Sequence, residues 1–375
     1  MHAPNDTDVD ALVERVRREP GRHHELIALL DENAPLYQGR GTVASGWIRA
    51  WLMAKFAEFG LPPEALPIVV EVLENDFEPR ALAAAALASR GMVAPNGEVV
   101  TALITALRNL RGRDEPVDLA TRDIALPTHP TTSASLEILA ALRWQPAADV
   151  RTAEALEEID GQWADTWNPQ VRRAFADTVA ALRTRRPATL DLVPALLPIQ
   201  NQNIDPAPRV GTANALESVI VEDQSGARLP LREYLSRSVT VLAFFYTRCQ
   251  NPNKCSATIT KLAQLGRELV TTSPTTQIAA ITYDPSYDLP GRLLRYGADR
   301  DLAFSDAVRM FRTVVGHADV QSFFALHVGY NGSMVNRHGI ELFLVDADLT
   351  VSRSWSRVRW QVDDVAKAVK LPNCR

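Results

Sequence analysis

The stretch Val239-Thr-Val-Leu-Ala-Phe-Phe-Tyr246-Thr-Arg-Cys249-Gln-Asn-Pro-Asn-Lys-Cys255-Ser-Ala-Thr-Ile-Thr-Lys-Leu262 decides the fold of the C-terminal part of this chain. It opens with a continuous run of β-branched and aromatic residues, which is typical of a strand buried on both faces. It closes with apolar residues three and four positions apart, from Ile259 to Leu269, which predict a helix. Two of the chain's 3 cysteines lie between strand and helix. A thiol pair at that place indicates redox or metal chemistry.

The proline between the two thiols sets where the helix begins. Because the residue before a proline is disfavoured in helical geometry, Pro252 separates the loop from the helix. Asn253 then suits the N-cap, which places Lys254 and Cys255 in the first turn, where the helix macrodipole favours a thiolate. Cys249 lies on a loop that is able to fold back towards Cys255. The pair can therefore close a disulfide or hold one soft metal ion, and the sequence does not choose between them.

The composition is that of a globular protein with two domains. At 375 residues the chain is long for one core, and 46% hydrophobic with 23% charged residues excludes a disordered chain. A formal net charge of -5 argues against nucleic acid or an anionic membrane surface as the main partner. No apolar run reaches transmembrane length. We therefore expect neither nucleic-acid binding nor membrane insertion.

The N-terminus and the cysteines indicate the compartment. Residues 1–8 contain neither the basic nor the apolar segment of a secretion signal, which predicts a cytoplasmic protein. In a reducing compartment, a close cysteine pair is more often a metal site or a transient redox site than a structural disulfide. Cys374, next to the C-terminus, is interpreted as an incidental exposed thiol.

Residues 1–195 predict an all-α domain. Apolar residues recur at helical spacing, and glycine and proline fall between the repeats. Two segments, 75–87 and 167–182, share a polar turn, an early arginine and a helix face of small residues. This pattern resembles the HEAT repeat, in which helix pairs stack into a solenoid. An irregular helical domain is the alternative, and either interpretation makes this part an interaction module. The helices are expected at residues 9–17, 47–59, 65–73, 79–89, 98–110, 133–143 and 171–182.

Residues 196–212 carry prolines and amides without periodicity, which predicts a linker. Residues 213–375 then alternate between strand and helix patterns. The expected order is a hairpin, a short helix, β-α-β-α, and finally β-β-α, with residues 308–315 assigned to a helix. That order predicts a thioredoxin-like fold, so the whole chain is expected to be an all-α HEAT-like domain followed by an α/β domain.

The C-terminal part also resembles a known family. Phe244-Phe-Tyr-Thr-Arg-Cys249, the second thiol Cys255 and Thr282-Tyr-Asp284-Pro are similar to motifs of the Sco/SenC copper-protein family. His338, placed directly before the expected strand 340–346, completes the resemblance, which covers residues 213–371. It implies that Cys249, Cys255 and His338 bind one copper ion, as Cu(I), Cu(II) or both, and that Asp284 supports the site. It also implies that the two cysteines can exchange thiol and disulfide forms.

The spacing of the two cysteines departs from the family's pattern. The family usually places fewer residues between its cysteines, whereas here 5 residues, Gln-Asn-Pro-Asn-Lys, intervene. The longer loop should alter its geometry, and with it the affinity for copper. In the family's favour, thiolates with one imidazole suit Cu(I) and can hold Cu(II), while zinc usually requires a fourth ligand. Arg248 and Lys254, next to the thiols, would lower their pKa values.

Three functions remain open on the sequence. The first is a copper-binding metallochaperone or sensor whose helical domain recruits a protein partner. The second is an enzyme, a thiol-disulfide oxidoreductase or peroxidase, in which Cys249 and Cys255 form the redox pair. The third is a degenerate site on a helical interaction module. We favour them in that order, and the sequence leaves open whether the protein is an enzyme.

Overall fold

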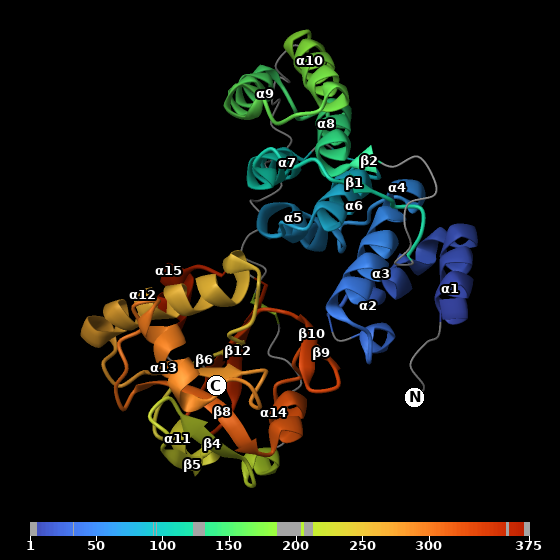
Figure 1. Ribbon diagram of the computed structural model, residues 1–375. Coiled ribbons are helices and arrows are strands. Elements are labelled where there is room, and N and C mark those ends of the chain that lie inside the picture. The colour runs from blue at the N-terminus through green and yellow to red at the C-terminus, as the bar shows by residue number, and fades with distance from the viewer. Residues whose placement is uncertain are drawn as a thin grey trace. The chain divides into compact units, whose positions relative to one another are not determined.

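The computed structural model describes residues 6–32, 34–92, 94, 96–122, 132–185, 204–205, 213–357 and 360–370. The chain divides into two compact units, Met1–Leu196 and Leu197–Arg375, which Figure 1 shows in blue to green and in yellow to red. Most of the predicted linker and the Cys374 thiol lie outside the described residues. Within the part of the chain that is described, no helix has the length and apolar character needed to cross a bilayer.

The described residues of the first unit form helices and one short strand pair, Pro116–Val117 (β1) with Thr132–Ser133 (β2). Helix α6 packs against α3, α5 and α8, and α8 packs in turn against α7 and α10. The apolar faces of these helices form one hydrophobic cluster. The HEAT-like character of the unit stays a prediction. Its α-helices are α1 (Asp6–Arg18), α2 (His23–Leu29), α3 (Thr42–Ala54), α4 (Phe56–Phe59), α5 (Leu66–Asn75), α6 (Pro79–Ser89), α7 (Gly97–Leu110), α8 (Ala134–Trp144), α9 (Val150–Trp163) and α10 (Pro169–Arg183).

Two helices of this unit were not predicted, and one predicted helix is broken. The expected helix 47–59 is divided at Lys55 into α3 and α4. Helix α2 spans only 7 residues and buries only Leu26, too little for a periodic pattern. Helix α9 is mostly polar and buries a narrow stripe that includes Leu156 and Ile159, while Asp149 caps its N-terminus. Narrow stripes of this kind give a weak signal in the sequence.

The second unit is built on a mixed sheet of 8 strands in the order β3-β12-β11-β6-β7-β8-β4-β5. Strands β6 and β7 are parallel and joined by α12, whereas β11 and β12 form an antiparallel pair that α15 follows. The central order β7-β6-β11-β12 with these connections is the thioredoxin-like arrangement that the sequence predicts. The strands are β3 (Ile204–Asp205), β4 (Ile220–Asp223), β5 (Arg228–Pro230), β6 (Thr240–Phe245), β7 (Gln277–Thr282), β8 (Val308–Val315), β11 (Glu341–Val345) and β12 (Val351–Ser356).

Each face of this sheet buries its own cluster, because successive residues of β6 point to opposite sides. Val241, Ala243 and Phe245 face one cluster, which α12, α13 and α15 cover. Leu242 and Phe244 face the other, which α11, α14 and the hairpin β9–β10 cover. Figure 1 shows α12 and α15 lying together on their side of the sheet. The covering elements are α11 (Leu231–Leu235), α12 (Ala257–Thr272), α13 (Pro290–Ala298), α14 (His317–Phe323), α15 (Val362–Lys370), β9 (Val328–Asn331) and β10 (Met334–His338).

The prediction of a helix at residues 308–315 is wrong. This segment is strand β8, parallel to β7 and antiparallel to β4. Met310 enters one cluster and Phe311 the other, as expected for neighbouring residues of a strand. Arg312 forms an ion pair with Glu222 on β4. Pairing with two strands therefore outweighs the helical spacing of the apolar residues.

One short strand lies inside the predicted linker. Residues Ile204–Asp205 form β3, which pairs with Trp355 and Ser354 at the edge of the sheet. Part of the predicted linker therefore belongs to the sheet of the second unit.

Candidate metal centre

The loop that carries Cys249 follows β6 and is held by a buried carboxylate. Asp288, fully buried, accepts hydrogen bonds from the Thr247 backbone amide (3.0 Å) and from the hydroxyls of Thr247 and Thr282. Burial raises the pKa of Asp288. Because Thr282 ends β7, this carboxylate ties the start of the loop to the neighbouring parallel strand. The loop therefore leaves the sheet in a fixed direction.

Asp284 reaches the loop through Arg248. Its carboxylate, buried, accepts from Nε of Arg248 at 3.1 Å and forms an ion pair with the same guanidinium. The guanidinium also lies 4.1 Å from the ring centre of Tyr287. Asp284 does not belong to the group of side chains that could hold a metal ion. Its ion pair instead fixes Arg248, the residue just before Cys249.

Cys255 lies in a widened turn and not in the first turn of an α-helix. The predicted N-cap, Asn253, is wrong: Asn251 caps the turn, and its side chain accepts from the Asn253 backbone amide at 2.9 Å. Residues Pro252–Ser256 form a π-type turn, in which Lys254 has non-helical dihedral angles of φ -104 and ψ -105. Helix α12 begins only at Ala257. The turn buries Cys255 completely.

His338 ends strand β10 instead of leading directly into the next strand. β10 pairs with β9, with an irregularity between Val335 and Arg337, and β11 begins at Glu341. The His338 Nδ1 atom lies 2.7 Å from the backbone carbonyl oxygen of Gly339. Because a carbonyl oxygen only accepts, this hydrogen bond places the imidazole proton on Nδ1. The lone pair of Nε2 is then available to a ligand.

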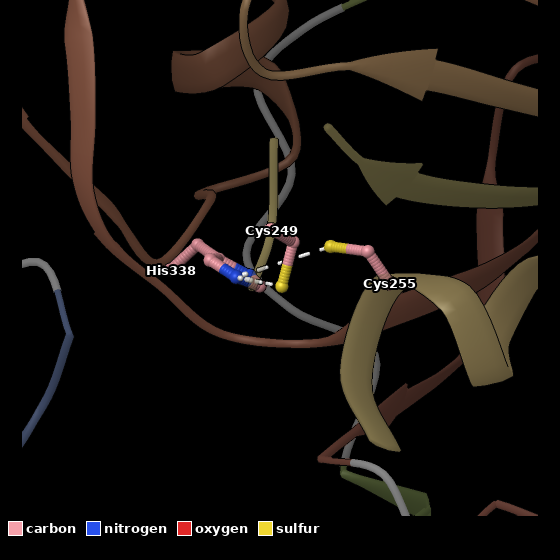
Figure 2. Close-up of side chains that lie close together, drawn as sticks. All are labelled: Cys249, Cys255 and His338. Atoms are coloured by element: carbon pink, nitrogen blue, oxygen red, sulfur yellow. Dashed lines mark hydrogen bonds between the residues drawn. The ribbon is translucent and has the colours of Figure 1, made fainter. Parts of the chain in front are cut away.

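The structure brings the three predicted ligands together. Nε2 of His338 lies 3.4 Å from Sγ of Cys249 and 3.9 Å from Sγ of Cys255 (Figure 2). The three donor atoms all lie within 4.8 Å of one another, in a group that could hold a metal ion. His338 is 7% exposed and Cys255 fully buried, whereas Cys249 is half-buried.

Two tyrosines form the walls around the imidazole. The Tyr246 ring meets it edge to face, with ring centres 5.0 Å apart, and the Tyr283 ring lies 5.7 Å away. Burial raises the pKa of both phenols. Both tyrosines belong to the motifs that carry the family resemblance, but the sequence predicts no role for either. Their positions at the ends of β6 and β7 are the signal that would have found them, since these ends meet at one edge of the sheet.

The pKa values of the two thiols are shifted in opposite directions. A hydrogen bond from Cys255 lowers the pKa of Cys249. Burial raises the pKa of Cys255, and the neighbouring Cys249 adds to that rise. Arg248 is predicted from the sequence to be a cause, but this guanidinium pairs with Asp284 instead. Cys249 is therefore the more acidic of the two thiols.

Two sulfur atoms and one imidazole nitrogen form a donor set for a single soft metal ion. Thiolates bind Cu(I) well, and imidazole extends the set to Cu(II), while a closed zinc site usually has four ligands. The two sulfur atoms lie within 4.8 Å of each other and would have to approach to about 2.0 Å for a disulfide to form. Fold and site together define a thioredoxin-like domain with two cysteines between β6 and α12 and a histidine at the end of β10.

Comparison with known proteins identifies the particular family. Residues 221–371 match the profile of the SCO1/SenC family, and the C-terminal unit of this chain therefore belongs to that family. The match covers less than half of the chain, and the helical unit lies outside it. No curated protein matches the sequence.

Solved structures of low similarity include several Sco proteins. BsSco, described as a member of the Sco family of cytochrome c oxidase assembly proteins, is 23% identical, with a TM-score of 0.37 over 45% of this chain and 96% of that one. Yeast Sco1 with copper bound is 20% identical, with a TM-score of 0.33 over 42% and 90%. Arabidopsis thaliana ScoI with copper bound is 17% identical, with a TM-score of 0.34 over 41% and 95%. The family assignment rests on the sequence profile.

Proposed function

We propose that the C-terminal unit binds one copper ion through Cys249, Cys255 and His338, and that the protein acts in copper delivery or sensing. The observation that carries the proposal is the convergence of two sulfurs and one nitrogen within 4.8 Å, with His338 in the tautomer that leaves Nε2 free. Two further grounds support copper as the ion: the match to the SCO1/SenC family and the soft sulfur donors of the site. Asp284 is proposed to support the site by fixing Arg248.

The difference in burial among the three ligands suits transfer of the ion. Cys255 and His338 are buried, whereas Cys249 is half-buried on a loop. A partner's ligand can therefore approach the metal from the side of Cys249 and replace that thiolate first. We propose that the helical unit recruits such a partner, and that both processes take place in the cytoplasm. Cell fractionation tests the location, and proximity labelling with and without residues 1–196 tests the recruitment.

The copper site is tested by an anaerobic Cu(I) titration against a competing chelator on the full-length protein. We expect one tight site per chain, which is lost in Cys249→Ser and in Cys255→Ser, because each variant removes a thiolate. In His338→Ala the site should be weakened, since two thiolates remain for the soft ion. Cys374→Ser and His24→Ala are the matched controls. His24 is exposed on α2 of the helical unit, so its loss should leave the affinity unchanged.

The opposite result would move the assignment to redox chemistry. If the wild type shows no tight site, but two thiols oxidise reversibly, copper binding is wrong. The protein is then better described as a thiol-disulfide oxidoreductase or peroxidase that uses the pair Cys249 and Cys255. A protein with neither property would leave the helical unit as an interaction module with a degenerate site beside it.

A further inference from the structure

A buried carboxylate lies behind the histidine of the metal centre, in a strand that is otherwise apolar. Glu341 opens β11, is 4% exposed, and precedes Leu342, Phe343 and Leu344. Its Oε2 atom accepts a hydrogen bond from the Tyr283 hydroxyl at 2.5 Å, and its Oε1 atom accepts one from the His327 backbone amide at 2.6 Å. A buried carboxylate is costly unless it is bonded in this way. Its presence in the core therefore calls for a role.

The hydrogen bond from the His327 amide connects Glu341 to the imidazole of His338 through the backbone. His327, whose amide the carboxylate holds, accepts a hydrogen bond on its own carbonyl from the Gly339 amide at 2.7 Å. The Gly339 carbonyl in turn accepts from Nδ1 of His338 at 2.7 Å. Contact is close here, because a Cβ on Gly339 would lie 3.3 Å from the Cβ of His327. The carbonyl that fixes the tautomer is thus held in place by His327.

The hydrogen bond from the Tyr283 hydroxyl connects Glu341 to the ring that flanks the imidazole. The Tyr283 hydroxyl is held by Glu341, while the backbone carbonyl of Tyr283 accepts from the Tyr330 hydroxyl at 2.9 Å. Between these two points, the phenol ring lies 5.7 Å from the imidazole of His338, centre to centre. The Tyr283 ring also stacks on the Phe244 ring, with ring centres 5.8 Å apart. The wall beside the imidazole is therefore fixed at both of its ends.

We propose that Glu341 is a positioning residue, which holds His338 in its ligand tautomer and orientation through Gly339 on one side and Tyr283 on the other. The inference rests on the proposed copper function for its consequence. Groups that do not touch the metal but fix the tautomer and orientation of a ligating histidine increase its affinity for the metal. Two thiolates dominate the binding of the soft Cu(I) ion, so the position of the imidazole matters most for Cu(II).

The metal-free, full-length protein gives the first test. Histidine labelled with ¹⁵N reports the tautomer of each imidazole at one fixed pH, and the spectrum of His338→Ala assigns the signal. In the wild type, we expect His338 with its proton on Nδ1. In Glu341→Met, which is of similar length and has no acceptor, a mixture of tautomers should appear. Glu341→Gln keeps an acceptor for the His327 amide and should restore the wild-type signal. An unchanged Nδ1–H signal in Glu341→Met overturns the proposal.

Folding of the variant is the one complication, because Glu341→Met leaves the Tyr283 hydroxyl without its acceptor. The double variant Glu341→Met with Tyr283→Phe removes both partners of that bond, which costs less than removing one. It should show the same mixture of tautomers as the single variant. Asp223→Asn is the control for a lost buried carboxylate elsewhere in the unit. Asp223 pairs with Arg309, and its loss should leave the His338 signal as it is.

Copper binding gives the second test. In Glu341→Met, we expect the Cu(II) affinity to fall about 10–100-fold, with a much smaller change for Cu(I). The thiolate-to-Cu(II) absorption band should also shift. The double variant His338→Ala with Glu341→Met should bind no worse than His338→Ala alone, because Glu341 acts through the histidine. An additional loss in the double variant contradicts the proposal. A wild type that binds no copper overturns the proposed function, whereas the tautomer measurement still decides the role of Glu341.

Discussion

At the scale of the residue, the two thiols of the centre differ although both face His338. Cys249 is half-buried and bonded by Cys255, which lowers its pKa, while burial raises the pKa of Cys255. The thiolate is the nucleophile in alkylation. An ordinary cysteine, with a pKa of about 8.5, loses reactivity as the pH falls below that value. Cys249 should not follow that pattern.

We predict that iodoacetamide alkylates Cys249 of the reduced, metal-free protein at a nearly constant rate between about pH 8 and pH 6, given the ordinary thiol pKa of about 8.5. The depressed pKa keeps Cys249 ionised throughout this range. Cys255→Ala removes the hydrogen-bond donor, so the pKa of Cys249 should rise and its rate should fall with pH. Peptide mapping by mass spectrometry separates Cys249 from Cys255 and Cys374. A wild-type rate that falls tenfold per pH unit would contradict the prediction.

The sequence could predict the three proposed ligands but not the residues that hold them in place. Cys249, Cys255 and His338 are the chemically distinctive residues of the C-terminal part, and their order along the chain suffices to propose them. Glu341 is distinctive only as a charge in an apolar strand, and its partners Tyr283 and His327 are distant in sequence. The contacts of Glu341, on β11, with Tyr283 after β7 and with His327 before β9 arise only when the sheet forms. No local pattern contains them.

At the scale of the element, the helical unit depends on one close approach of backbone to backbone. Gly91 follows α6, and its carbonyl accepts from the Leu61 amide at 2.8 Å. A Cβ at this position would lie 2.0 Å from the Phe56 carbonyl oxygen. Gly91 therefore meets the first residue of α4 at a distance that only glycine permits.

We predict that Gly91→Ala lowers the free energy of unfolding of the helical unit by about 1–3 kcal/mol, since the backbone must shift to admit the methyl group. Gly161→Ala is the matched control. Gly161 lies in α9, where an added Cβ would meet no atom within 4 Å, so alanine should raise the stability by about 0.5–1 kcal/mol. Thermal unfolding followed by circular dichroism measures both. Equal effects of the two substitutions would show that the close approach does not matter.

Helices and strands could be predicted where the local sequence pattern determines them, but not where pairing with distant strands does. The run 239–246 is entirely β-branched, apolar or aromatic, and the observed β6 is buried along its whole length. In 308–315 the apolar residues fit helical spacing as well as a strand. The choice is made by β7 and β4, which pair with this segment on its two sides, and by Arg309 and Arg312, which reach Asp223 and Glu222. Those partners lie more than 25 residues away, beyond any local window.

At the scale of the whole molecule, the chain contains separate hydrophobic cores. Among the described residues, one cluster draws all its members from residues 9–182, and the two clusters on the faces of the sheet draw theirs from residues 215–369. A domain that buries its own core can unfold as its own cooperative unit. Metal binding should then stabilise only the unit that provides the ligands.

We predict two transitions in the thermal unfolding of the full-length protein under reducing, anaerobic conditions. Cu(I) supplied at about 1,000 times its dissociation constant should stabilise the C-terminal unit by about 4 kcal/mol and raise only its transition. Gly91→Ala should lower only the other transition, and in Cys255→Ser the shift by copper should disappear. A scanning calorimeter resolves these changes. A single transition that both copper and Gly91→Ala displace would mean that the two cores unfold together, and that a partner bound to the helical unit can alter copper affinity through stability alone.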